Sequence, residues 1–74
     1  MRELTISDFQ EFNLEKRINI PRLKLKNIEL FYDQNKETQH TCIVKVNNTT
    51  VMEILTKNKE TMLKWLIEDI RKYG

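Results

Sequence analysis

The C-terminal segment 58–73 has apolar residues at three- and four-residue spacing, and this pattern constrains the fold most strongly. At about 100° per residue they fall within one arc of a helical wheel; they are Met62, Leu63, Leu66, Ile67, Ile70 and Tyr73. The spacing predicts an amphipathic helix, capped by Thr56 or Asn58 and with Arg71 and Lys72 in its last turn. Because only one face of such a helix is apolar, the rest of the chain must supply a surface that covers it.

Residues 41–56 predict a β-hairpin that turns at Asn47 and Asn48. Asparagine tolerates the positive φ of tight hairpin turns, and the flanking Thr, Ile, Val, Met and Leu residues favour strands. With a two-residue loop, the expected pairs are Val46–Thr49, Lys45–Thr50, Val44–Val51, Ile43–Met52 and Cys42–Glu53. A longer loop shifts this register by one residue.

Residues 22–33 predict another strand, with an interruption. Leucines alternate with cations up to Lys26, and the apolar phase changes after Asn27, which indicates a bulge or break there. Pro21 fits the start of such a strand. The polar run 33–40 is expected to be the loop that leads into the hairpin.

The N-terminal segment predicts a short helix at 7–16, because Ser7 and Gln10 have the spacing of a capping box. A strand at 2–6 is a further expectation. The combined pattern predicts one α+β domain over residues 1–74: a three-stranded antiparallel sheet, four-stranded if 2–6 joins it, with a short N-terminal helix and the long C-terminal helix on one face. We expect the N-terminal segment to cover the second face; a second copy or a partner would be the alternative.

The scarcity of reactive and flexible residues excludes several classes of site. The single glycine, Gly74, is the last residue, so the chain has no phosphate-cradling loop, dinucleotide fingerprint or glycine-flanked nucleophile. One His and one Cys cannot form a four-ligand zinc site, and a pair of ligands from His40 and Cys42 would need a second copy. Ser7, Asp33 and His40 could in principle supply a catalytic triad, but His40 is expected in a polar loop and Ser7 is better explained as a helix cap. We therefore expect no enzyme activity, no cofactor and no metal.

Hydropathy and cysteine content bear on location. No segment approaches the about 20 apolar residues of a membrane span, and residues 1–10 contain no continuous apolar run of a signal peptide. A lone cysteine, Cys42, fits a reducing compartment, so we expect a cytoplasmic protein with no membrane association. Abundant Lys, Ile and Asn with no Ala indicates an A/T-rich coding genome, a composition common in bacterial phages and mobile elements.

The positive charge is concentrated in one segment. The chain has a formal charge of +2, but residues 15–27 contain five cations and one anion, and the remainder is mildly acidic. If 22–26 is extended, Arg22, Lys24 and Lys26 project from one face about 7 Å apart. Such a row can protect a sheet edge, bind an acidic protein surface, or follow nucleic-acid phosphates. Nucleic acid ranks last, because no aromatic residues are interleaved with these cations.

Two aromatic residues add to the candidate surface. Trp65 lies at the margin of the apolar arc, where it either packs at the edge of the core or anchors a partner. Phe31 points away from Ile28, Leu30 and Tyr32, and it either packs under the N-terminal segment or contacts a partner.

These features favour a non-enzymatic protein-binding module that occupies an acidic surface of its partner. Its specific form would be a phage or mobile-element inhibitor of a host protein, such as a host-defence nuclease complex. The alternatives are a small nucleic-acid-binding module that uses strand 22–26, or a structural homodimer. The candidate partner-binding residues are Lys16, Arg17, Arg22, Lys24, Lys26, Phe31 and Trp65.

Overall fold

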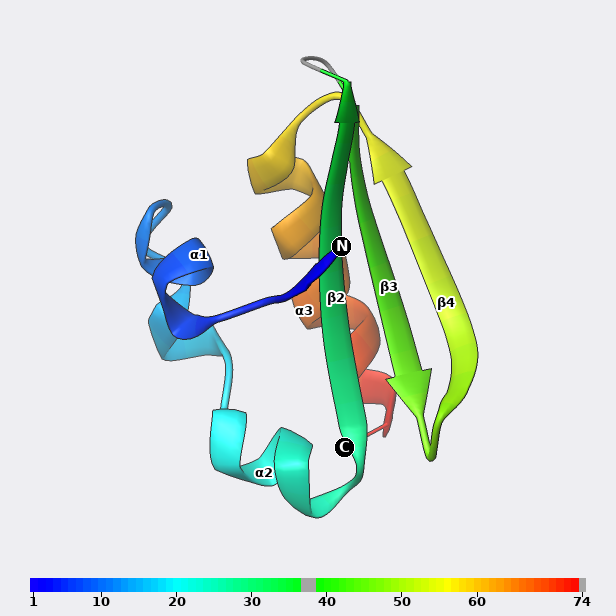
Figure 1. The fold of residues 1–74 in the computed structure, drawn as a ribbon. Helices are drawn as coiled ribbons and strands as arrows, with labels where there is room; N and C mark the ends of the chain where they lie inside the picture. The colour runs from blue at the N-terminus through cyan, green and yellow to red at the C-terminus, as the bar shows by residue number, and fades with distance from the viewer. Residues whose placement is uncertain (37–38, 74) are drawn as a thin grey trace.

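The computed structural model describes residues 1–36 and 39–73 and confirms the α+β class (Figure 1). In these residues, four strands form one antiparallel sheet in the order β1-β2-β3-β4: β1 (Arg2–Glu3), β2 (Ile28–Lys36), β3 (Gln39–Val46) and β4 (Thr49–Thr56). The helical elements are α1 (Ile6–Gln10), the 3₁₀ turn η1 (Glu15–Arg17), α2 (Ile20–Leu25) and the long α3 (Lys59–Tyr73).

The expected C-terminal helix is confirmed as α3. Asn58 caps it, since its Oδ1 accepts a hydrogen bond from the backbone N–H of Thr61 at 3.0 Å. Thr56 supports the cap: its Oγ1 accepts from the Asn58 N–H at 3.0 Å. The helix buries four residues of its apolar arc against the sheet, namely Met62, Leu63, Leu66 and Ile67.

The hairpin of β3 and β4 turns where expected, but the register predicted from the sequence is wrong beyond the Lys45–Thr50 pair. Asn47 and Asn48 have φ values of 52° and 65°, as a tight hairpin turn requires. A register shift between Val44 and Lys45 then places Val44 opposite Met52 instead of Val51. Because a bulge adds one residue to one strand, every later residue of β4 changes partner: Ile43 lies opposite Glu53, and Cys42 opposite Ile54.

The expected strand at 22–26 is wrong, because these residues belong to α2 and its end. Asn19 caps α2 through a 3.2 Å hydrogen bond from the backbone N–H of Arg22 to its Oδ1. Pro21 lies in the first turn, where its missing N–H costs no helical hydrogen bond. Asn27 has φ of 55° and reverses the chain into β2. The phase change at Asn27 thus marks the end of a helix and not a bulge.

Two other boundaries also differ from expectation. β2 continues to Lys36 and β3 begins at Gln39, so the described part of 33–40 is strand; residues 37–38 lie outside the described residues. The N-terminal helix is split into α1 and η1, and the capping pair is Thr5 with Asp8 instead of Ser7 with Gln10. The N–H of Thr5 donates to Asp8 Oδ2 at 2.9 Å. The strand expected at 2–6 is reduced to the two residues of β1.

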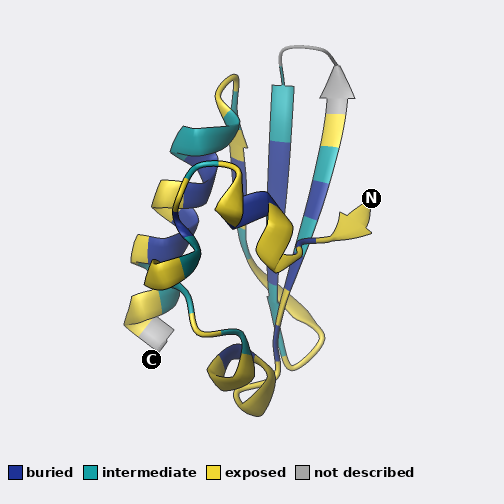
Figure 2. Cartoon of the chain, turned by 90° about the vertical axis from the view of Figure 1, so that its left-hand side faces the viewer, coloured by how far each residue is buried: buried dark blue, intermediate teal, exposed yellow. Residues whose placement is uncertain are grey.

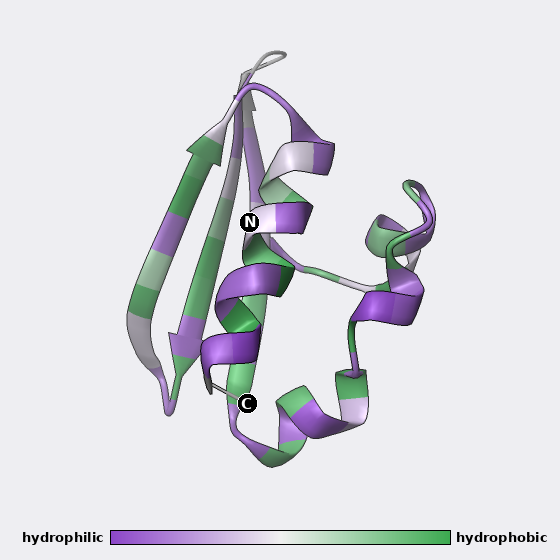
Figure 3. Cartoon of the chain, turned by 180° about the vertical axis from the view of Figure 1, so that it is seen from behind, coloured by the Kyte–Doolittle hydropathy of each residue, from purple (hydrophilic) through white to green (hydrophobic). Residues whose placement is uncertain are grey.

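The N-terminal segment packs on the same side of the sheet as α3, so the expectation that it covers the second face is wrong (Figures 2 and 3). Its buried side chains Leu4, Phe9, Leu14 and Leu23 form one core with α3 and the strands. The bulge in the hairpin explains the difference, since it turns Ile54 toward this core together with Val44. The opposite side of the sheet, which we call the outer face, carries Phe31, Ile43, Glu53 and Leu55.

Candidate functional site

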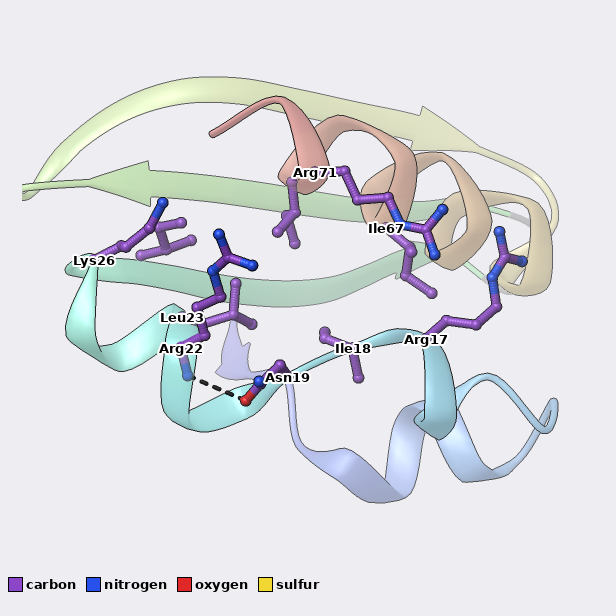
Figure 4. A pocket seen from close by; sticks show the side chains of 10 residues that line it. Arg17, Ile18, Asn19, Arg22, Leu23, Lys26, Ile67 and Arg71 are labelled. Carbon is purple, nitrogen blue, oxygen red and sulfur yellow. Dashed lines mark hydrogen bonds between the residues drawn. The ribbon is translucent and has the colours of Figure 1, made fainter. Parts of the chain in front are cut away.

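A pocket lies between the N-terminal segment and the C-terminal half of α3 (Figure 4). Four cations from three elements line it: Arg17 of η1, Arg22 and Lys26 of α2 and its end, and Arg71 of α3. In Figure 4, Arg22 and Lys26 lie toward one end of the pocket and Arg17 toward the other, with Arg71 reaching over from α3. We call this pocket and its four cations the basic groove.

The local sequence of α2 explains why only some of its cations reach the groove. Arg22 and Lys26 are four residues apart and therefore lie on the same side of the helical turn. Leu23 points into the core and is 7% exposed. Lys24 projects to the other side of α2, where it lines shallow surface depressions beside Glu3 and Ile28. Helical geometry thus separates cations that a strand would have aligned.

The floor of the basic groove is aliphatic. It is formed by five side chains from the η1–α2 connection, α2, β2 and α3, which are Ile18, Leu23, Ile28, Ile67 and Ile70. The cavity has a volume of about 180 Å³. Such a cavity can hold one group of about benzene size, because engineered apolar cavities of about 150 Å³ bind benzene. It is smaller than the about 300–1,000 Å³ of typical small-molecule and cofactor sites.

The electrostatics of the groove favour an anionic ligand. Among the described residues that line it there are four cations and no carboxylate. All four cationic residues are exposed, so they meet a ligand at a surface where water and salt screen each pair. Arginine, which supplies three of the four, presents a planar fork of donors that fits a carboxylate or a phosphate. The arrangement can therefore bind an acidic group beside an apolar one.

The remaining candidate residues lie elsewhere. Lys16 is exposed on η1 but does not line the groove, and Lys24 faces away from it. Phe31 is on the outer face, half-buried beneath the ammonium of Lys45, whose Nζ lies 5.3 Å from the ring centroid. Trp65 is 51% exposed on α3 and is not part of the groove lining. The structure brings together Arg17, Arg22 and Lys26 from the candidate set.

Arg71 and the aliphatic floor are parts of this surface that the sequence pattern did not predict. The pattern indicates for Arg71 only a place in the last turn of the helix. A signal was present, because Arg71 follows Ile67 by four residues and therefore lies beside it on α3. The spacing predicts a place for Arg71 in the groove only when α2 and η1 are known to pack next to this end of α3.

A second polar cluster joins the N-terminus to the start of α3. Asp8, 5% exposed, accepts hydrogen bonds from Arg2 at 2.6 and 2.9 Å and from Lys59 at 3.3 Å. Lys59 also donates to Glu11 at 2.8 Å. Arg2 and Lys59 lie 4.8 and 5.1 Å from the centroid of the Tyr32 ring. The phenol oxygen of Tyr32 is 2.6 Å from Nδ1 of His40.

Three members of this cluster, Arg2, Asp8 and Lys59, have pKa values shifted toward their charged forms. The hydrogen bond from Arg2 is the main reason that the pKa of Asp8 lies well below its usual range, although burial acts in the opposite direction. Burial disfavours the ammonium of Lys59, but hydrogen bonds to Glu11 and Asp8 outweigh it and raise the pKa of Lys59. Fully paired charges of this kind hold two segments together, which is a structural role.

The structure also describes the surroundings of Cys42 and of the residues that could hold a metal ion. Cys42 is fully buried, and this burial raises the pKa of its thiol to about 12, which makes the reactive thiolate scarce. The described residues contain no cluster of three or more His, Cys, Asp and Glu side chains that could hold a metal ion. None of the described helices is long and apolar enough to cross a membrane.

Comparison of the chain with protein-family profiles, with curated proteins and with solved structures finds no match.

Proposed function

We propose that this chain is a non-enzymatic protein-binding module whose basic groove binds an acidic segment of a partner protein. The observation that carries this proposal is that Arg17 of η1 and Arg71 of α3 lie beside an aliphatic floor, next to the cations of α2 and its end, which have partners of their own; the described lining residues include no carboxylate. Charge complementarity of this kind steers association and selects acidic partners.

The floor of the groove favours a polypeptide over nucleic acid as the ligand. Single-stranded nucleic acids are held by aromatic side chains on which bases stack, and duplexes by cations that track the phosphate backbone. The described groove lining has no aromatic residue, and its cations surround a pocket instead of forming a track. The nucleic-acid alternative was based on a cationic strand at 22–26, which the structure replaces with α2.

The cellular setting forms part of the same proposal. We place the module in the cytoplasm of a bacterial host, where a reducing environment keeps a single thiol such as Cys42 free. Inhibition of a host protein by a phage or mobile element stays a prediction about what the binding achieves. A homodimer also stays a prediction, and a monomer mass in analytical ultracentrifugation would contradict it.

The proposal is tested with labelled poly-L-glutamate as a model acidic polypeptide, by fluorescence anisotropy at an ionic strength of about 0.15 M, where the Debye length is about 8 Å. The double variant Arg17→Glu/Arg71→Glu should bind about tenfold more weakly or worse, since two attractions become repulsions. The matched control Lys24→Glu/Lys57→Glu makes the same change in net charge on exposed residues outside the groove lining. It should bind within about twofold of the unmodified protein once the loss of net charge is screened.

Two results would overturn the proposal. One is equal loss of binding in the groove variant and the control, which would mean that only net charge matters. The other is tighter binding to a DNA or RNA duplex than to poly-L-glutamate, with the steep salt dependence that phosphate contacts produce. Circular dichroism of each variant checks that the fold is intact.

A further inference from the structure

Two arginines of the basic groove, Arg17 on η1 and Arg71 on α3, have exposed side chains that line the same pocket. Within the described part of the chain, neither forms a salt bridge or a side-chain hydrogen bond. This distinguishes them from Arg22 and Lys26, which have interactions of their own. The charge available to a ligand is therefore that of Arg17 and Arg71.

The two guanidinium groups point into one region. Figure 4 shows the side chain of Arg71 extending from α3 toward the end of the pocket where Arg17 lies. Asp69, the carboxylate nearest to Arg71 in the sequence, pairs with Lys72 at 3.3 Å. Glu15, the nearest to Arg17, is not among the described residues that line the pocket. Two like charges thus face one space without a carboxylate from the described residues between them.

We propose that Arg17 and Arg71 together bind the phosphate of a phosphorylated serine or threonine in the acidic segment of the partner. This inference rests on the proposed function and specifies the acidic group that the segment presents at this end of the groove.

A doubly charged anion fits two arginines better than a single carboxylate does. A carboxylate has one negative charge and two oxygens, and one guanidinium fork can already engage both. A phosphate monoester carries about −1.5 to −2 charges at pH 7 and has three acceptor oxygens, so both arginines can donate to it. Clusters of arginine are a recurrent means of recognising phosphorylated segments. The phosphodiesters of nucleic acid carry one charge each, which again matches one arginine.

The backbone from which each arginine extends is fixed by the fold. The N–H of Arg17 donates to the carbonyl of Leu14 at 3.0 Å, and Arg71 lies in the last turn of the 15-residue helix α3. Their neighbours in the sequence, Ile18 and Ile70, are half-buried and pack against the core. Binding therefore has to order only the two side chains, which limits its entropic cost.

The test uses one acidic peptide in three forms, with phosphoserine, glutamate or serine at a single position. Affinities are measured by isothermal titration calorimetry at an ionic strength of about 0.15 M. The phosphoserine form should bind at least about fivefold more tightly than the glutamate form, and the serine form should bind most weakly. The preference for phosphoserine should increase between about pH 5.5 and pH 7.5, because the phosphate gains its second charge at a pKa of about 6.

Protein variants locate the phosphate on the groove. Arg17→Gln/Arg71→Gln removes both charges and should bring the affinities for the phosphoserine and glutamate forms within about twofold of each other. The matched control Lys16→Gln/Lys24→Gln makes the same change in net charge on exposed residues outside the groove lining and should keep the preference. Circular dichroism confirms that both variants are folded.

The outcomes separate this inference from the proposed function. Affinities within about twofold for the phosphoserine and glutamate forms on the unmodified protein would overturn the phosphate site and leave the acidic-segment proposal standing. A preference that Arg17→Gln/Arg71→Gln retains would also overturn the site. So would free O-phosphoserine or an oligonucleotide that binds as tightly as the phosphopeptide. If poly-L-glutamate binding itself proves independent of the groove cations, the proposed function fails, whatever the peptides do.

Discussion

Replacing Asp8 by asparagine tests whether its polar cluster holds the N-terminal segment to α3. The change preserves the shape of the side chain but removes the charge that Arg2 and Lys59 share. It also weakens the acceptor that the N–H of Thr5 uses at the start of α1. The expected result is a less stable protein with the same fold.

The magnitude follows from the exposure of each partner. The Arg2 side chain is 51% exposed, so its pair with Asp8 contributes about 1 kcal/mol after solvent screening. Lys59 is 17% exposed but keeps Glu11 at 2.8 Å, so it is not left as an uncompensated buried charge. Weakening the cap at Thr5 costs about 1 kcal/mol. We therefore expect the free energy of unfolding to fall by about 2 kcal/mol, from a total of about 4–11 kcal/mol for a chain of this length.

Urea denaturation followed by circular dichroism measures this change, with a melting temperature expected about 8–16 °C lower. The control is Glu68→Gln, which removes an exposed carboxylate from α3. It should change the free energy of unfolding by less than about 0.5 kcal/mol. A loss below about 0.5 kcal/mol for Asp8→Asn would refute the reasoning, because the cluster would then contribute no more than an ordinary surface residue.

The pH dependence of the free energy of unfolding tests the same cluster, and the direction of the change follows from the pKa of Asp8. The pKa of Asp8 is lowered in the folded protein from an ordinary value of 3.8 in the unfolded chain. Its stabilisation is therefore present above about pH 4 and is lost as the pH falls toward the folded pKa. The unmodified protein should lose more stability than Asp8→Asn between neutral pH and pH 3, so the two stability curves converge in acid. Parallel curves would contradict the shift.

Two further predictions concern buried and turn residues. Because Cys42 is fully buried and its thiol pKa is raised to about 12, a thiol reagent should label it only through unfolding. The labelling rate should rise with the unfolded population as urea is added. Fast labelling without urea would contradict this prediction. Asn48 has φ of 65°, so Asn48→Val should cost about 1–2 kcal/mol, whereas Asn48→Gly should not destabilise the hairpin; equal melting temperatures for the two variants would show that the turn does not require this conformation.

Sequence reasoning succeeded where a short segment determines its own structure. The spacing of apolar residues in 58–73 identifies α3, and two consecutive asparagines identify the turn between β3 and β4. Both depend on local geometry: a helix repeats every 3.6 residues, and a tight hairpin turn needs residues that tolerate positive φ. The start and end signals of α2, Asn19 and Asn27, are also local, but the leucine–cation alternation at 22–26 predicts a strand where the structure has a helix.

Only the tertiary structure decided how these elements combine. The bulge at Val44 and Lys45 turns Ile54 of β4 toward the core, which no alternation pattern in β4 indicates. Packing of the N-terminal segment on the α3 side leaves the outer face open and places η1 and α2 beside the end of α3. The chain by itself determined that its cations are concentrated in 15–27. Arg71 lies more than forty residues away in the sequence and lines the basic groove only because of packing. Contacts between distant residues depend on how apolar faces are buried together.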